Sequence, residues 1–261
     1  MAKQDPATAK KFAALLKKSI TAYKGEDPPP RDPVAQLIVS FMQWDSTRTK
    51  AEDAFVALME EMIDVNDLRV SHPHELVEVI GKDYPNAVNR VIRLRESLHE
   101  VYAREHDIQM HSIAGKGKKE QRAYLDSLPG IAPYIAAQVT LLSFGGHAMP
   151  IDDKLLALLI NEGCLHEGTS IADAESYLVR QIKAGDALEA HLALQAWADK
   201  RKAPAAKAPA KTTKTTKASK TTKSTKTTKK KTTKTTKATK SAPKKKVAKK
   251  KTTKKKVTKK K

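Results

Sequence analysis

The chain has 261 residues and a formal net charge of +21, from 50 Lys plus Arg against 29 Asp plus Glu. Residues 201–261 hold 27 basic residues and no acidic one, so residues 1–200 hold 50 − 27 = 23 basic and 29 acidic residues, a net charge of −6. The chain therefore consists of an acidic body and a basic tail, and it is not basic throughout. The body is long enough to bury one hydrophobic core, or a core in two lobes, so the chain is not disordered throughout.

A single cysteine, Cys164, excludes an internal disulfide and a four-cysteine zinc or iron–sulfur site. We therefore expect an intracellular, reducing location, with Cys164 as a buried structural thiol. The longest apolar run near the N-terminus covers only residues 12–16, which is too short for the core of a signal peptide or for a membrane span. A soluble protein without a membrane partner is expected.

The N-terminal part of the chain predicts two helices and a connector. Apolar residues recur at helical spacing over 6–23, which indicates an amphipathic helix. The run 25–33 contains three consecutive prolines and cannot continue a helix, so it is expected to be a stiff connector. Asp32 followed by Pro33 is typical of a helix N-terminus, so the next helix should begin there. These features divide the chain into an N-terminal helix and connector (1–30), a body (31–200) and a tail (201–261).

Further helices are predicted along the body, whereas strand patterns are almost absent. Nothing alternates between apolar and polar residues over a useful length, only 5% of residues are aromatic, and no internal repeat is found. The fold class expected is all-α, a two-lobed helical bundle. The additional predicted helices cover residues 49–62, 74–80, 86–106, 118–125, 133–143, 153–161, 171–183 and 187–200.

The tail differs in kind from the body. It repeats Lys-Thr-Thr over residues 211–240 and continues in lysine blocks over 244–261, with only two valines to bury there, so it is predicted to be disordered. Its lysines, exemplified by Lys211, Lys230, Lys231 and Lys245, would neutralise phosphates by releasing counterions, without reading the base sequence. A solubilising role, RNA binding and binding to an anionic membrane are alternatives, but the regular spacing of the lysines favours nucleic acid.

Residues 128–163 carry the most informative pattern in the sequence. Leu128 closes one helix, the residues from Pro129 to Ile131 form a tight turn, and Pro133 starts a second helix. Gly130 permits a left-handed turn, so that backbone N–H groups at the head of the second helix can face a phosphate. The pattern predicts a helix-hairpin-helix that would contact DNA phosphate through Gly130, Ile131 and Ala132.

The residues around this hairpin resemble the endonuclease III-like superfamily of helix-hairpin-helix DNA glycosylases. Members read L-P-G-h-G-x-x-x-A across the hairpin and then place an essential aspartate in a P-h-D segment after a glycine-containing loop. The matching residues here are Leu128, Pro129, Gly130, Ile131 and Ala136, followed by Gly145, Gly146, Pro150, Ile151 and Asp152. The resemblance covers about residues 32–200 and is strongest at the hairpin and the aspartate, while the tail resembles that of histone H1.

This resemblance implies base excision, in which a flipped nucleotide loses its base through an oxocarbenium-like sugar. Asp152 would stabilise that cation and orient or deprotonate the attacking water, with Asp153 as the alternative carboxylate. Either aspartate could also cap the following helix, and both roles can coexist. Gln43 and Tyr134 would line the base pocket. Trp44 would join them at the base pocket. Trp44 and Asp45 could also wedge into the duplex, although a tryptophan beside an apolar helix more often packs in the core.

Departures from the family pattern narrow the expected activity. Tyr134 stands where the lyase branch has its Schiff-base lysine, which implies hydrolysis without strand cleavage, although a packing role for this tyrosine stays open. Val39 stands where adenine-excising relatives have glutamate, so that specificity is disfavoured. Ala132 replaces the second hairpin glycine, which would weaken the grip on phosphate. The cysteines of the family's iron–sulfur cluster are missing, so no cluster, metal or other cofactor is expected.

The sequence therefore predicts a monofunctional DNA N-glycosylase for a damaged or mismatched base in double-stranded DNA. The alternative is a catalytically inactive DNA-binding or nucleoid-organising protein with the same fold and tail. A third possibility is another helical module that uses the hairpin only for binding, which predicts no pocket beside Asp152. A monomer associated with DNA, in a nucleoid or a nucleus, is expected in the first two cases.

Overall fold

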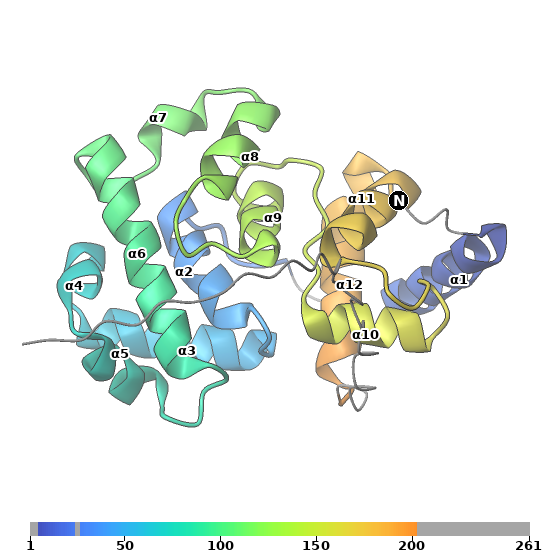
Figure 1. The fold of residues 1–261 in the computed structure, drawn as a ribbon, viewed down its shortest axis with the longest axis horizontal. Helices are drawn as coiled ribbons and strands as arrows, with labels where there is room; N and C mark the ends of the chain where they lie inside the picture. Colours follow the sequence, from blue (N-terminus) through green and yellow to red (C-terminus); the bar gives the residue numbers. More distant parts are fainter. Residues whose placement is uncertain (1–4, 24–26, 203–261) are drawn as a thin grey trace, which may run out of the picture. The chain divides into compact units, whose positions relative to one another are not determined.

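A computed structural model describes residues 5–23 and 27–202, and in these ranges it contains helices and no strand (Figure 1). The predicted disordered tail, with Lys211, Lys230, Lys231 and Lys245, lies outside the described residues. The helices are α1 (Pro6–Ala22), α2 (Pro33–Gln43), α3 (Arg48–Glu61), α4 (Val65–Val70), α5 (Pro73–Ile80), α6 (Ala87–Glu105), α7 (His111–Ala114), α8 (Lys118–Asp126), α9 (Pro133–Leu142), α10 (Asp153–Asn161), α11 (Ile171–Gln181), a 3-10 turn η1 (Ala184–Asp186) and α12 (Ala187–Asp199).

The predicted all-α fold is confirmed, and local capping explains several helix starts. Asp32 accepts hydrogen bonds from the amides of Val34 and Ala35, both at 2.9 Å, and Pro33 fills the first helical position of α2, as the sequence predicts. The short helices α4 and α7 were not predicted, because six and four residues are too few for a periodic pattern. None of the described helices is both long and apolar enough to span a membrane.

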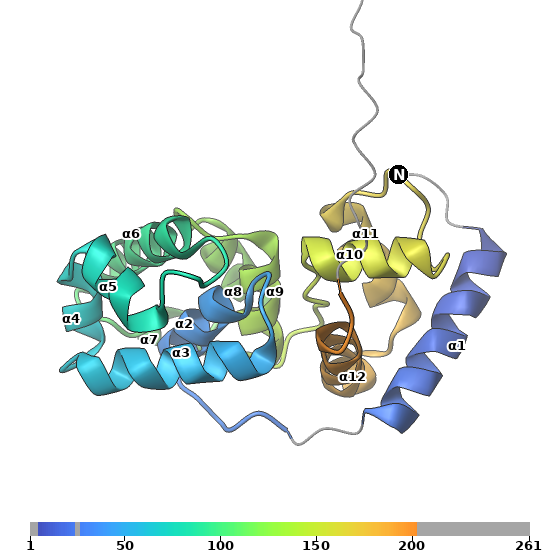
Figure 2. The same ribbon diagram turned by 90° about the horizontal axis from the view of Figure 1, so that it is seen from below.

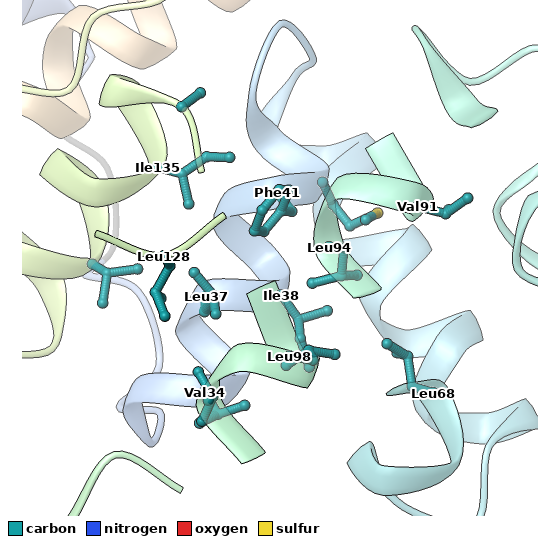
Figure 3. Close-up of a cluster of buried hydrophobic side chains, with 14 of the residues drawn as sticks. Val34, Leu37, Ile38, Phe41, Leu68, Val91, Leu94, Leu98, Leu128 and Ile135 are labelled. Atoms are coloured by element: carbon teal, nitrogen blue, oxygen red, sulfur yellow. The ribbon is translucent and has the colours of Figure 1, made fainter. Parts of the chain in front are cut away.

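The first of two hydrophobic clusters gathers side chains from α2 to α9 (Figure 3). Helix α2 lies at its centre, with Leu37, Ile38 and Phe41 fully buried. Figure 3 shows these side chains opposite Leu94 and Leu98 of α6. The end of α2, which carries Gln43 and Trp44, is therefore held by packing along the whole helix.

The second cluster is built from α1, α10, α11 and α12. Phe12 of α1 is buried in it together with Leu159 of α10, Leu178 of α11 and Leu194 of α12. Helix α1 packs against α12, and Figure 2 shows the two helices as neighbours. Two clusters correspond to the predicted two-lobed arrangement.

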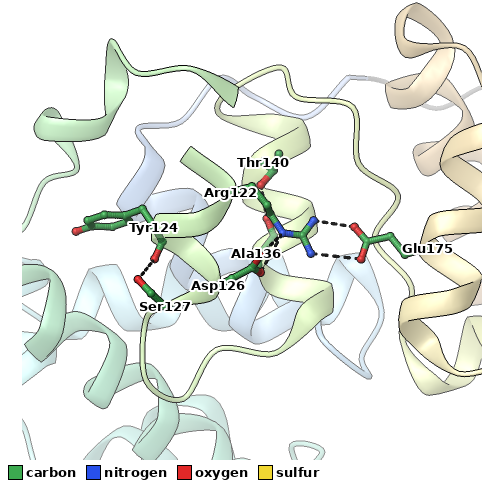
Figure 4. Close-up of polar contacts among 7 residues, drawn as sticks. All are labelled: Arg122, Tyr124, Asp126, Ser127, Ala136, Thr140 and Glu175. Atoms are coloured by element: carbon green, nitrogen blue, oxygen red, sulfur yellow. Dashed lines mark hydrogen bonds and ion pairs between the residues drawn. The ribbon is translucent and has the colours of Figure 1, made fainter. Parts of the chain in front are cut away.

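Helix α9 contributes to both clusters. Ile135 and Val139 belong to the first, whereas Ala137 and Leu141 belong to the second. This explains why α9 is buried on nearly all sides rather than along one stripe. A second link joins α8 to α11, where both terminal nitrogens of Arg122 donate to the carboxylate of Glu175 (Figure 4). The hairpin helix α9 and the segment that leads to Asp152 consequently lie at the junction of the two clusters.

Candidate active site and DNA interface

The structure contains the predicted helix-hairpin-helix, formed by α8, the turn 127–132 and α9. Gly130 adopts φ +76°, the left-handed region, and a Cβ atom there would lie 2.5 Å from the carbonyl oxygen of Arg93. Two features therefore require glycine at position 130: the left-handed backbone conformation and the close approach of the turn to α6. Ala132 is the N-cap residue of α9 and is buried, and Ile131 is half-buried against the first cluster.

Helix α6 holds the hairpin turn through side-chain hydrogen bonds. Arg93 Nε donates to the Gly130 carbonyl oxygen at 2.6 Å, and Ser97 Oγ donates to the Pro129 carbonyl oxygen at 2.6 Å. The Arg93 guanidinium also lies 4.5 Å from the centroid of the Trp44 ring. The turn expected to meet phosphate and the residue expected to flank the base are therefore joined through one side chain.

Asp152 is the N-cap residue of α10 and is almost completely buried, with 3% of its surface exposed. Its Oδ1 accepts a hydrogen bond from the Leu155 amide at 2.7 Å. Burial raises the pKa of its carboxyl from the ordinary 3.8 to about 6, the Leu155 hydrogen bond opposes this, and the negative charge of Asp45 adds to it. The sequence left open which aspartate caps this helix, and in the structure the capping residue is Asp152. Asp153 is the exposed first residue of α10.

Tyr134 lies in the same site and is also buried, with 2% of its surface exposed. Its hydroxyl is 3.5 Å from Gln195 Oε1 of α12. Burial raises the pKa of this phenol well above 10, and the negative charges of Asp152 and Asp199 act in the same direction. The phenol consequently stays neutral and can serve as a hydrogen-bond donor, but not as an amine-like nucleophile.

Asp45 and Asp199 complete an acidic surrounding for Tyr134. Burial raises the pKa of Asp45, as does the charge of Asp153, while Arg90 and a hydrogen bond from the Asp153 backbone lower it. Asp45 has φ +53°, a left-handed conformation that is uncommon for a residue other than glycine. Asp199 also has a raised pKa because of burial, and its Oδ2 accepts from the Arg48 amide at 3.0 Å.

Gln43, the last residue of α2, is buried and accepts a hydrogen bond from Gln138 Nε2 at 2.8 Å through its Oε1. Both glutamines line a small cavity of about 10 Å³ that His191 of α12 also borders. Such a volume is about that of one water molecule. Neither Tyr134 nor Asp152 is among the residues that line this cavity.

Trp44 follows α2 and is half-buried against the first cluster. The carbonyl groups at this helix end are satisfied by Arg90, a fully buried side chain that donates to the Phe41 carbonyl oxygen and, at 3.4 Å, to that of Met42. Tyr84 donates to the Met42 carbonyl oxygen as well, at 2.7 Å. Buried donors therefore fix the backbone that presents Gln43 and Trp44.

The structure brings Asp152, Tyr134 and Asp199 close enough to influence one another electrostatically, and it pairs Gln43 with a glutamine that the sequence did not single out. Three residues of this site were missed: Gln138, Gln195 and Asp199. Gln138 lies four residues after Tyr134, one helical turn away, so helical spacing could have indicated it. Helix α12 carried no motif, so nothing in its sequence pointed to Gln195 and Asp199.

Cys164 is buried, as expected, and burial raises the pKa of its thiol to about 11. Within residues 5–23 and 27–202, no group of three or more His, Cys, Asp or Glu side chains could hold a metal ion. The histidines that the sequence left without a ligand pattern, His72, His74, His111, His147 and His166, are exposed.

The fold is similar to that of solved DNA glycosylases. A complex of endonuclease III with DNA superimposes with a TM-score of 0.58 at 16% identity, covering 72% of this chain and 84% of that chain. A thermostable thymine-DNA glycosylase gives 0.54 at 18% identity, with coverage of 74% and 88%. An 8-oxoguanine glycosylase/lyase of Clostridium acetobutylicum bound to DNA gives 0.57 at 16% identity, with coverage of 74% and 69%. The sequence matches no family model and no curated protein.

Proposed function

We propose that this protein is a monofunctional DNA N-glycosylase, which hydrolyses the N-glycosidic bond of a damaged or mismatched base in double-stranded DNA. The observation that carries the proposal is the position of Asp152, a buried carboxylate with a pKa of about 6 that caps α10 after the loop following the hairpin helix α9. The shared fold with glycosylases that act on DNA supports the assignment to this class of enzyme.

The chemistry requires a group that favours positive charge on the sugar and assists water. Above pH 6 the Asp152 carboxylate is mostly ionised, so it can stabilise an oxocarbenium-like sugar and accept a proton from the attacking water. Gln43, Trp44 and Tyr134 would surround the flipped base. Because Tyr134 carries a neutral phenol in place of an amine, no Schiff base forms, and cleavage of the DNA strand is not part of the reaction.

Attraction to DNA would come mainly from the tail. The body, residues 1–200, carries a net charge of −6, whereas residues 201–261 hold 27 basic residues. Lysines such as Lys211, Lys230, Lys231 and Lys245 would neutralise phosphates along the duplex, and the hairpin residues Gly130 to Ala132 would fix the protein on it. The protein would act as a monomer on the DNA of a nucleoid or nucleus, without a cofactor.

A second candidate function is DNA binding without catalysis, in an architectural or nucleoid-organising role. One specific observation favours it: the side chains of Asp152 and Tyr134 are almost fully buried, with 3% and 2% of their surfaces exposed. A site that stays closed on DNA would bind duplex through hairpin and tail but would excise nothing.

The test is a strand-nicking assay on duplexes that carry uracil, a thymine–guanine mismatch, an alkylated base or an oxidised base, with alkali to cleave abasic sites. Wild type is compared with Asp152→Asn and with Asp153→Asn, the exposed neighbour. Cleavage that depends on alkali, is lost in Asp152→Asn and is retained in Asp153→Asn would support the glycosylase. Salt-sensitive DNA binding without processing of any lesion would support the architectural role.

A further inference from the structure

We propose that Arg93 of α6 is a DNA-phosphate ligand, a charged side chain that complements the backbone amides of the hairpin. The inference rests on the DNA binding in the proposed function, but not on catalysis. It assigns a role to a residue that has no place in the hairpin motif and lies 37 positions before Gly130 in the chain.

Two contacts fix the guanidinium of Arg93. Nε donates to the Gly130 carbonyl oxygen at 2.6 Å, and the group lies 4.5 Å from the centroid of the Trp44 ring. A guanidinium has five N–H donors in one plane, and the Nε bond uses one of them. The four N–H groups of the terminal nitrogens have no hydrogen-bond acceptor among the residues that the structure describes.

Arg93 belongs to the arginines of this acidic body that have no carboxylate partner among the described residues, as do Arg69, Arg90 and Arg95. Arg31, Arg104 and Arg122 each form an ion pair with a carboxylate. In the described part of the chain no carboxylate lies within ion-pairing distance of Arg93, which is half-buried. A fixed, unneutralised guanidinium with its terminal edge unused is suited to binding a phosphate through two parallel hydrogen bonds.

Arg93 lies beside the hairpin turn, so the phosphate that it would bind is one of the duplex that contacts the hairpin. The hairpin turn packs directly on α6, since a Cβ at Gly130 would meet the Arg93 backbone at 2.5 Å. Backbone amides at the head of α9 form the electropositive end of that helix. Arg93 adds a full positive charge at the same turn, next to Ala132, the N-cap residue of α9, whose side chain makes no capping hydrogen bond. A duplex that reaches the hairpin therefore reaches Arg93 as well.

The competing interpretation is that Arg93 only holds the hairpin carbonyl. Arg95 provides a matched control because it lies on the same helix, is also half-buried, and donates through Nε to a backbone carbonyl, that of Arg69, at 3.3 Å. Substituting either arginine removes one charge and one hydrogen bond to the backbone. Only Arg93 lies at the hairpin.

The experiment uses the full chain with 15N-labelled arginine and two duplexes, one undamaged and one with an abasic-site analogue. Arg93→Gln and Arg95→Gln assign the side-chain signals in NMR spectra. On addition of duplex, the terminal N–H signals of Arg93 should shift and become protected from exchange, while those of Arg95 stay unchanged. Arg93→Gln should weaken duplex binding about tenfold, as expected for loss of a charged hydrogen bond, and Arg95→Gln by less than about twofold.

Terminal signals of Arg93 that stay unchanged at saturating duplex would overturn the proposal, and so would equal shifts at Arg95. A loss of affinity in Arg93→Gln without these shifts would identify a structural role for Arg93. Failure of the proposed enzyme activity is recognised separately. If wild type excises no base but the Arg93 signals respond to duplex, the glycosylase proposal fails and the phosphate ligand stands.

Discussion

Replacement of Asp152 by asparagine is expected to stabilise the folded protein at neutral pH while it abolishes excision. Burial raises the pKa of this carboxyl from 3.8 to about 6, so the folded state binds a proton more tightly than the unfolded state does. The free energy of unfolding therefore falls as the pH rises from about 4 to about 6, because the buried group must ionise. A shift of about two pH units corresponds to about 3 kcal/mol.

Asparagine removes this cost and keeps the cap on α10, because its side-chain oxygen can accept the Leu155 hydrogen bond equally well. Urea unfolding of wild type and Asp152→Asn at pH 4 and at pH 7.5 measures the effect. The variant should match wild type at pH 4, where the wild-type carboxyl is already protonated in the folded state. At pH 7.5 it should be more stable by about 3 kcal/mol.

Asp153→Asn is the control, since this neighbour is exposed and should change stability by less than about 0.5 kcal/mol at either pH. A difference between wild type and Asp152→Asn that is the same at both pH values would refute the reasoning. A wild type that is the more stable protein at pH 7.5 would do so too. Either result would mean that the burial of Asp152 does not strain the folded state.

Three further predictions follow from the same site and its surroundings. The rate of excision by wild type should increase with pH and level off above about 6. Asp45→Asn should move this pH–rate profile to lower pH, because it removes a negative charge that raises the pKa of Asp152, and asparagine tolerates the left-handed backbone at this position. An unmoved profile would show that Asp45 does not influence the pKa of Asp152. Gly130→Ala should lower the free energy of unfolding, measured by urea titration, by about 3 kcal/mol, because the alanine would be strained in the left-handed region and its Cβ would lie 2.5 Å from the Arg93 carbonyl oxygen. Gly168→Ala is the control: this glycine has φ +80° but open space around it, so the free energy of unfolding should fall by only about 1 kcal/mol. Equal costs would show that the close approach to α6 is unimportant. A chain that ends at Lys202 lacks 25 lysines. In a plot of the logarithm of DNA affinity against the logarithm of salt concentration, its slope should be shallower by about 0.9 for each phosphate that those lysines neutralise in the full chain. An unchanged slope would show that the tail does not contact DNA.

The site combines requirements that oppose each other. A carboxylate that must act on a cation is placed where burial penalises its own charge, with Asp45 and Asp199 adding repulsion. Nearby, Arg90 is fully buried beneath the end of α2 and its positive charge partly offsets that of Asp45. Stability is thus reduced at the position where the proposed chemistry needs a basic carboxylate.

Local features of the sequence determined the helices and the hairpin. Asp32 and Pro33 start α2, Gly130 turns the hairpin, and Asp152 caps α10, and each of these depends on residues within three or four positions along the chain. Such short-range constraints can be read without a structure. For the same reason the all-α class and the helix-hairpin-helix could be predicted, whereas α4 and α7 were too short to leave a periodic signal.

Tertiary structure alone decided the properties of the candidate site. Gln43 meets Gln138 across 95 positions of sequence, Tyr134 meets Gln195 across 61, and Arg93 meets Gly130 across 37. These contacts arise where helices pack, and no periodic pattern specifies which side chains will meet there. The pKa of Asp152 is likewise set by how completely the two clusters exclude water from it, a property of the assembled fold that a carboxylate in a sequence does not reveal.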